Sequence, residues 1–144
     1  MGGTLGEAEA AVRIAEGKVS KTLDVVFVRA VLCNWLVCMA VYMAGMARDV
    51  TGKAVAIWLP ISAFVAMGLE HTVANMFLIA LGMLNGADVS ITSFFVRNLL
   101  PVTVGNMVGA LAGLAIPLAL SYGSISKVPV KCKACFMTRG SNLV

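Results

Sequence analysis

The sequence GLEHTVAN, residues 68–75, places a glutamate and a histidine side by side within a long apolar stretch. Residues 54–69 before Glu70 and residues 72–87 after His71 carry no charge, which gives two flanks of 16 residues each. Each flank is too short to cross a bilayer comfortably, but the two together are more than long enough. Ionisable groups at that depth are costly and by default mark an ion or substrate pathway. A glycine-interrupted pair of half-length segments is also typical of a transporter binding site.

The composition predicts a membrane protein. Of the 144 residues, 60% are hydrophobic and only 12% are charged, and the mean hydropathy is +0.93. A soluble domain carries about a quarter charged residues. The net charge is +4, and the basic residues lie mainly at the chain ends and in short loops, as is normal at the boundaries of membrane spans. Because no basic patch is interleaved with aromatic residues, we expect no nucleic-acid partner.

The pattern of apolar runs predicts an all-α membrane protein with three transmembrane passes. The passes lie at about 25–47, at 54–87 as a broken helix, and at 98–123. Long uniform apolar runs exclude a β-barrel, so every span must be helical. Residues 1–24 form a polar amino-terminal segment, expected as a helix or loop on the membrane surface. Residues 85–98 are expected to form a loop or an interfacial stretch, and residues 127–144 a basic, disordered tail.

Three glycines recur every four residues in the last span, namely Gly105, Gly109 and Gly113. They fall on one helix face and allow a neighbouring helix to approach closely. Direct contact with a ligand is the alternative interpretation. A helix built for close approach needs partners, and three spans provide few, so oligomerisation or a missing half is expected.

The cysteines indicate no redox or metal chemistry. Cys33 and Cys38 lie inside an apolar span, where packing is the simplest interpretation. Cys132 and Cys135 form a single CxxC in the basic tail, and a redox or metal role would need a second pair or nearby histidines. We therefore predict no cofactor, no metal and no enzymatic activity. A membrane thiol oxidoreductase that uses the tail pair is the weakest alternative.

Glu70 and His71 allow two interpretations. They form either a structural polar pair bonded to helix ends or part of a transport pathway. Transport is favoured because the ends of a broken helix present unpaired N–H groups and a partial positive charge, which suit an anion. A histidine can also exchange a proton near neutral pH, and His71 is the only histidine of the chain.

Three stretches together resemble the formate/nitrite transporter family. They are CNWLVCMAV at residues 33–41, GLEHTVANMF at residues 68–77 and NLLPVTVGN at residues 98–106. They occur in family order and at family-like separation, and the resemblance covers roughly residues 15–123.

The resemblance implies a specific architecture. Members are pentamers whose protomers each have their own pore for small monovalent anions such as formate or nitrite. A protomer has six helices in two inverted three-helix halves, an aquaporin-like arrangement, and the second helix of each half is broken. This chain resembles the second half only. The partners implied are small anions, the lipid bilayer and further copies of the chain in a homo-pentamer; plasma and organelle membranes both stay open.

The resemblance also assigns pore residues. His71 corresponds to the central pore histidine, and Asn34 to a pore asparagine of the preceding helix. Val37 corresponds to a constriction residue one turn later. Phe64 corresponds to the aromatic residue of a hydrophobic constriction, seven residues before the histidine.

Two charged positions complete the implied site. Glu70 corresponds to the acid that supports the histidine region, and Lys18 to a vestibule lysine that draws anions to the pore. An anion held between apolar rings binds a proton more tightly because burial disfavours the charged form. If His71 supplies that proton, proton–anion symport results. If His71 instead stays protonated as an electrostatic anchor, the pore is a channel, and the sequence leaves both open.

The first half of the family fold is expected to be missing. The chain is then a fragment of a full transporter, a partner of a separate first-half polypeptide, or a half that assembles with itself in opposite orientations. The alternative function is that of a non-transporting membrane subunit that retains only the packing surfaces.

Overall fold

The computed structural model describes residues 3–122, and within this range every regular element is helical. The elements are α1 (Gly3–Val19), α2 (Leu23–Met46), α3 (Val50–Ala66), α4 (Thr72–Leu84), α5 (Ile91–Ser93), α6 (Leu100–Ala110) and α7 (Ile116–Tyr122). Two π-helical segments, Phe94–Leu99 and Leu111–Ala115, join α5, α6 and α7 into one continuous last helix. The predicted all-α class is confirmed. The tail with Cys132 and Cys135 lies outside the described residues.

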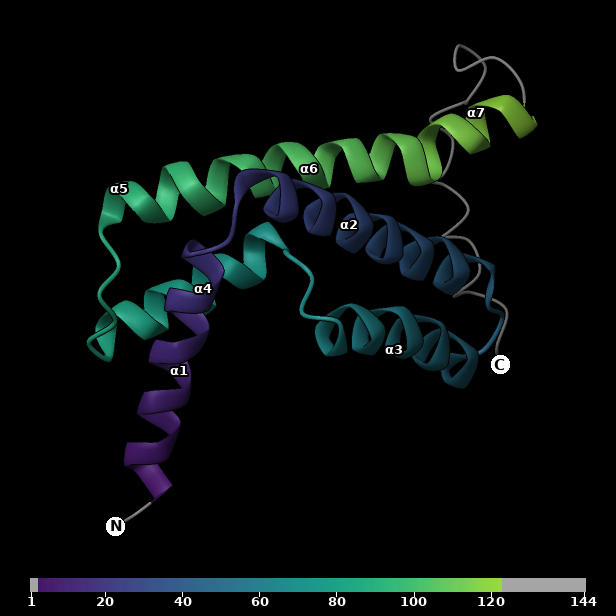
Figure 1. Ribbon diagram of the computed structural model, residues 1–144. Helices are drawn as coiled ribbons and strands as arrows, with labels where there is room; N and C mark the ends of the chain where they lie inside the picture. The colour runs from purple at the N-terminus through teal and green to yellow at the C-terminus, as the bar shows by residue number, and fades with distance from the viewer. Residues whose placement is uncertain (1–2, 123–144) are drawn as a thin grey trace, which may run out of the picture.

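The centre of the fold is the pair formed by α2 and α6, and α2 also packs against α3 (Figure 1). The glycine face of the last helix makes this pair possible. A Cβ atom on Gly105 would lie 2.7 Å from the Cβ of Ala30, and one on Gly109 would collide with the backbone oxygen of Val31. Close packing therefore explains these glycines, as the sequence predicts.

The interruption predicted at the Glu70–His71 pair is present. Helix α3 ends at Ala66 and α4 begins at Thr72. Gly68, inside the break, has a φ of +62°, a backbone conformation that favours glycine. The two helices have 17 and 13 residues, about 25 and 20 Å, so each is shorter than the roughly 30 Å hydrocarbon core. Only α2 and the last helix, within residues 3–122, are each long and apolar enough to cross a membrane alone.

Helix α1 differs from the expected surface segment because one of its faces packs against α4. Ala15 and Val19 are buried there together with Ile79. Gly82 of α4 permits the contact, since a Cβ atom at that position would lie 2.7 Å from the backbone oxygen of Ala11. Small apolar residues spaced four apart on α1 form this face, while the charged residues of the helix lie elsewhere.

The last helix begins at Ile91, whereas the sequence predicts a loop or interfacial stretch over residues 85–98 and a span that begins only at residue 98. The side-chain oxygen of Ser90 accepts a hydrogen bond from the backbone N–H of Ser93 at 3.2 Å and caps this early start. The charge of Arg97 suggested a loop, but an exposed arginine is compatible with a helix because its long side chain can reach a polar surface.

Candidate functional site at the helix break

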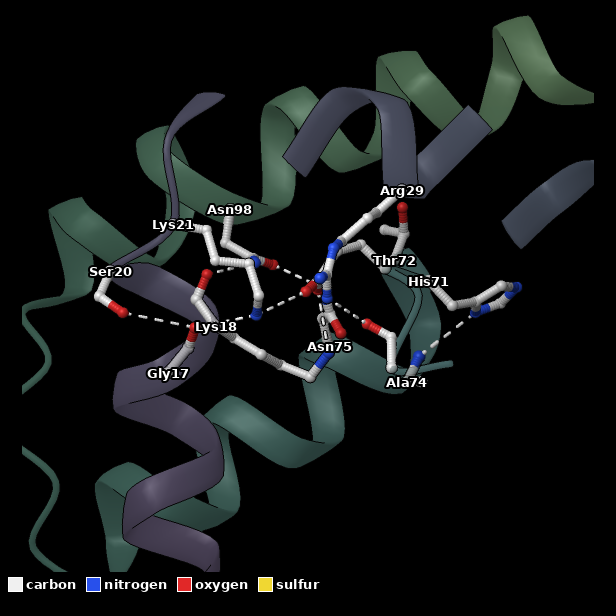
Figure 2. A network of polar contacts seen from close by, with 12 residues as sticks. Gly17, Lys18, Ser20, Lys21, Arg29, His71, Thr72, Ala74, Asn75 and Asn98 are labelled. Atoms are coloured by element: carbon white, nitrogen blue, oxygen red, sulfur yellow. Dashed lines mark hydrogen bonds and ion pairs between the residues drawn. The ribbon is translucent and has the colours of Figure 1, made fainter. Parts of the chain in front are cut away.

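Glu70 is a fully buried carboxylate that binds two lysines. The Nζ atom of Lys18 lies 2.9 Å from Glu70 Oε2, and the Nζ atom of Lys21 lies 3.0 Å from Oε1. The lysines come from the end of α1 and from the linker that follows it (Figure 2). A buried charge is tolerated only when it is paired and hydrogen-bonded, so these contacts hold the break against α1.

Two asparagines extend this polar cluster. The amide nitrogen of Asn75 donates to Glu70 Oε2 at 2.7 Å and to the side-chain oxygen of Asn98 at 2.8 Å. The amide nitrogen of Asn98 donates to the backbone oxygen of Lys18 at 3.3 Å. Both asparagines are fully buried. The contacts form a closed ring that joins α1, the break, α4 and the last helix.

Asn106 joins α2 to the break and to the start of α4. Its amide nitrogen donates to the backbone oxygens of Ala30, at 2.8 Å, and Glu70, at 3.0 Å. Its side-chain oxygen accepts from the backbone N–H of Thr72 at 3.0 Å and from the Thr72 hydroxyl at 3.1 Å. One side chain thereby satisfies backbone groups that the helix break leaves unpaired. Asn34 donates to the backbone oxygen of Asn106 at 2.7 Å.

His71 caps the amino end of α4. Its Nδ1 atom accepts a hydrogen bond from the backbone N–H of Ala74 at 3.4 Å. Its ring stacks on Phe64, with ring centres 5.9 Å apart and an angle of 21° between the planes. Figure 2 shows the histidine side chain directed away from Lys18 and Lys21. The break thus separates a charged cluster on one side from a histidine–phenylalanine pair on the other.

A further cation, Arg29 of α2, contacts the break. One of its guanidinium nitrogens donates to the backbone oxygen of Gly68 at 3.2 Å. The carbonyl groups at the end of α3 carry a partial negative charge, so an arginine is favourable near them.

The structure brings five of the six predicted site residues into contacts around the break. Lys18 pairs with Glu70, Phe64 stacks on His71, and Asn34 bonds to the last helix. The Lys18 ammonium group is thus held in an ion pair with the Glu70 carboxylate. The sixth, Val37, lies half-buried on α2, three residues after Asn34.

The sequence interpretation missed several residues of the site. They are Lys21, Thr72, Asn75, Asn98 and Asn106. The asparagines could have been identified from the sequence, because an asparagine inside an apolar run needs hydrogen-bond partners. Within residues 3–122, no group of three or more histidine, cysteine, aspartate or glutamate side chains could hold a metal ion.

A sequence model described as formate/nitrite transporter matches residues 1–120. The chain belongs to the formate/nitrite transporter family. It is 56% identical over 98 residues to a probable formate transporter of Methanothermobacter thermautotrophicus, an alignment that covers 67% of this chain and 35% of that protein. It is 39% identical over 113 residues to the formate channel FocA of Haemophilus influenzae, covering 66% of this chain and 40% of that protein.

A solved structure supports the same membership in the formate/nitrite transporter family. It is described as a pentameric formate channel with formate bound, and it superposes on this chain with a TM-score of 0.72 at 33% sequence identity. The superposition covers 80% of this chain and 52% of that chain. The chain therefore spans about a third to a half of the length of these relatives.

Membership confirms the predicted family and the predicted membrane location. The chain is an integral membrane protein of the formate/nitrite transporter family. The relatives bear the names of transporters and channels rather than enzymes, in agreement with the prediction that the chain is not an enzyme.

Proposed function

We propose that this chain forms one half of a transporter for small monovalent anions such as formate or nitrite. The observation that carries the proposal is the position of His71 at the amino end of α4, stacked on Phe64 at a break between two short apolar helices. Backbone N–H groups at a helix start favour an anion, and the phenylalanine supplies an apolar wall beside the histidine.

The proposed half has three membrane passes. The first is α2, the third is the last helix, and the second consists of α3, the break and α4 in series. Neither α3 nor α4 is long enough to cross a bilayer alone, whereas together they are. The polar backbone of the break is acceptable at membrane depth because Asn106 and Arg29 bind it. The opposing pore wall comes from a complementary first half, since relatives are about two to three times as long.

In the proposed mechanism His71 handles the proton. Because Nδ1 accepts the Ala74 N–H, a neutral imidazole carries its proton on Nε2. That N–H is then available to donate to an anion. An anion that leaves water for an apolar constriction loses its solvation and gains affinity for a proton. When His71 first takes up a proton from water, transfer of that proton to the anion returns the imidazole to its neutral form and lets the neutral acid cross, which couples anion movement to proton movement.

The positive charge near the break lowers the barrier to anion access. Lys18 and Lys21 bring two charges to one carboxylate, so the pair of lysines is not fully neutralised. An uncompensated positive charge close to a low-dielectric passage raises the local concentration of anions. Asn34 and Val37, on neighbouring turns of α2, are proposed to line the same passage.

The test is formate flux into liposomes. The full chain is reconstituted alone and together with the first three-helix half of its 56% identical relative. We expect pH-dependent formate uptake when both halves are present, because the pore needs two walls.

The His71→Ala variant should lose about a hundredfold or more of this flux, the usual scale for removing a proton-transfer group. Asn85→Ala, at the exposed carboxyl end of the same helix, is the matched control and should keep the flux. Absence of flux in both reconstitutions would contradict the proposal. That result would favour a membrane subunit that contributes packing surfaces only.

A further inference from the structure

The charges around the break do not balance within the described part of the chain. Lys18 and Lys21 share the carboxylate of Glu70, while Arg29 binds only the uncharged carbonyl oxygen of Gly68. Within residues 3–122, no second carboxylate lies within 4.0 Å of any of these three cations. Three positive charges therefore face one negative charge, and such an excess of positive charge attracts an anion.

Lys21 is the cation best placed to meet an anion that arrives from water. Its side chain is 24% exposed, compared with 11% for Lys18. Lys21 also lies in the short linker between α1 and α2 rather than within a helix. Lys18 is part of α1 and shares Glu70 Oε2 with Asn75, which fixes it in the cluster.

The hydrogen bonds of Lys21 leave room for a ligand. Its ammonium group donates to Glu70 Oε1 at 3.0 Å and to the backbone oxygen of Gly17 at 2.9 Å. An ammonium group has three N–H donors, so one donor of Lys21 has no acceptor among the described residues. Lys18 makes one hydrogen bond and keeps two such donors, so it is the greater exposure of Lys21 that distinguishes the two lysines. A small carboxylate such as formate would accept that third hydrogen bond and neutralise part of the excess charge.

We propose that Lys21 is the residue that first binds the incoming monovalent anion, and that Lys18 acts as the fixed partner of Glu70. The inference rests on the proposed anion transport and names a binding residue for it. The family resemblance assigns the attraction of anions to Lys18. The inference assigns this role instead to Lys21, three residues further along the chain.

The test measures binding rather than flux. The melting temperature of the purified full chain in detergent is titrated with sodium formate, at an ionic strength held constant with sodium gluconate. The variants are Lys21→Gln, which keeps donors but loses the charge, and Lys21→Arg, which keeps the charge. Lys53→Gln removes an exposed lysine near the far end of α3, about 20 Å from the break, and is the matched control.

We expect the formate dissociation constant of Lys21→Gln to rise about three- to tenfold at low ionic strength, the scale of a partly exposed ion pair. The rise should shrink as salt screens the charge. Lys21→Arg and Lys53→Gln should stay near the unmodified value. If Lys21 only stabilises Glu70, Lys21→Gln will melt earlier without formate but keep the dissociation constant, and that result overturns the inference.

The two proposals fail in different ways. If formate flux is observed but the formate dissociation constant does not depend on Lys21, or no formate binding is measurable, the inference about Lys21 is wrong and the transport proposal stands. Formate binding that depends on Lys21 without flux in either reconstitution removes transport and keeps Lys21 as a binding residue.

Discussion

At the scale of single residues, Glu70 determines how the break is held. Its carboxylate is fully buried and accepts from Lys18, Lys21 and Asn75, so it connects α1, the linker and α4. The pairing also offsets part of the cost of burying the Glu70 carboxylate, which would otherwise be an unpaired charge. Glu70 is therefore a structural residue of the site, whereas His71 beside it presents its ring to the opposite side.

Glu70→Gln should destabilise the chain. The amide would leave two lysine charges without a carboxylate, and removing one partner of a buried ion pair costs about 3 kcal/mol or more. The measurement is the free energy of unfolding in detergent. Glu9→Gln, on the exposed side of α1, is the control and should change little. A loss below about 1 kcal/mol for Glu70→Gln would show that the cluster does not hold the break.

The sequence alone was sufficient to find the centre of the site but not its contacts. An adjacent glutamate and histidine inside an apolar run are conspicuous because charge is expensive there. The partners of Glu70 were not predictable, because Lys18 and Lys21 lie about fifty positions away and their approach depends on how α1 crosses α4. Asn106 was within a recognised stretch, but its bonds to Ala30 and Glu70 depend on the rotation of the last helix.

At the scale of elements, the glycine face of the last helix sets how closely it approaches α2. The periodicity of Gly105, Gly109 and Gly113 was sufficient to predict this approach. The start of the same helix was not predictable from hydropathy, because Arg97 resembles a loop residue and the cap at Ser90 is a local hydrogen bond. The packing of α1 was also missed, since its small apolar face is narrow.

Gly109→Ala should separate the two helices and destabilise the chain by about 1–3 kcal/mol, because the added methyl group would collide with the backbone of Val31. Gly45→Ala in α2 is the matched control, since a Cβ atom there meets nothing within 4 Å. The control should be neutral or gain up to about 1 kcal/mol from helix propensity. Equal unfolding free energies for the two variants would contradict the packing argument.

At the scale of the whole molecule, much of the apolar surface has no partner within the described chain. Trp58, Phe77 and Leu120 have large side chains that are 66%, 65% and 81% exposed. Lipid, neighbouring copies and a complementary half are the surroundings that such surfaces need.

The chain co-purified with a complementary first half should form a pentamer, as the similar solved channel does. The expected result is a native mass equal to five copies of each half in mild detergent. A sample that contains only single pairs of halves, while retaining formate flux, would contradict the pentamer without affecting the proposed pore.

Asn98 and Asn106 lie on one continuous helix, yet they bind different neighbours: Asn75 and Lys18 for the first, and Ala30, Glu70 and Thr72 for the second. Inserting or deleting one residue between the two asparagines would turn one amide by about 100° relative to the other. Neither set of contacts could then form without losing the other. Length changes during evolution are therefore expected to be excluded from residues 98–106 and to concentrate in connections that form no regular element, such as residues 85–90.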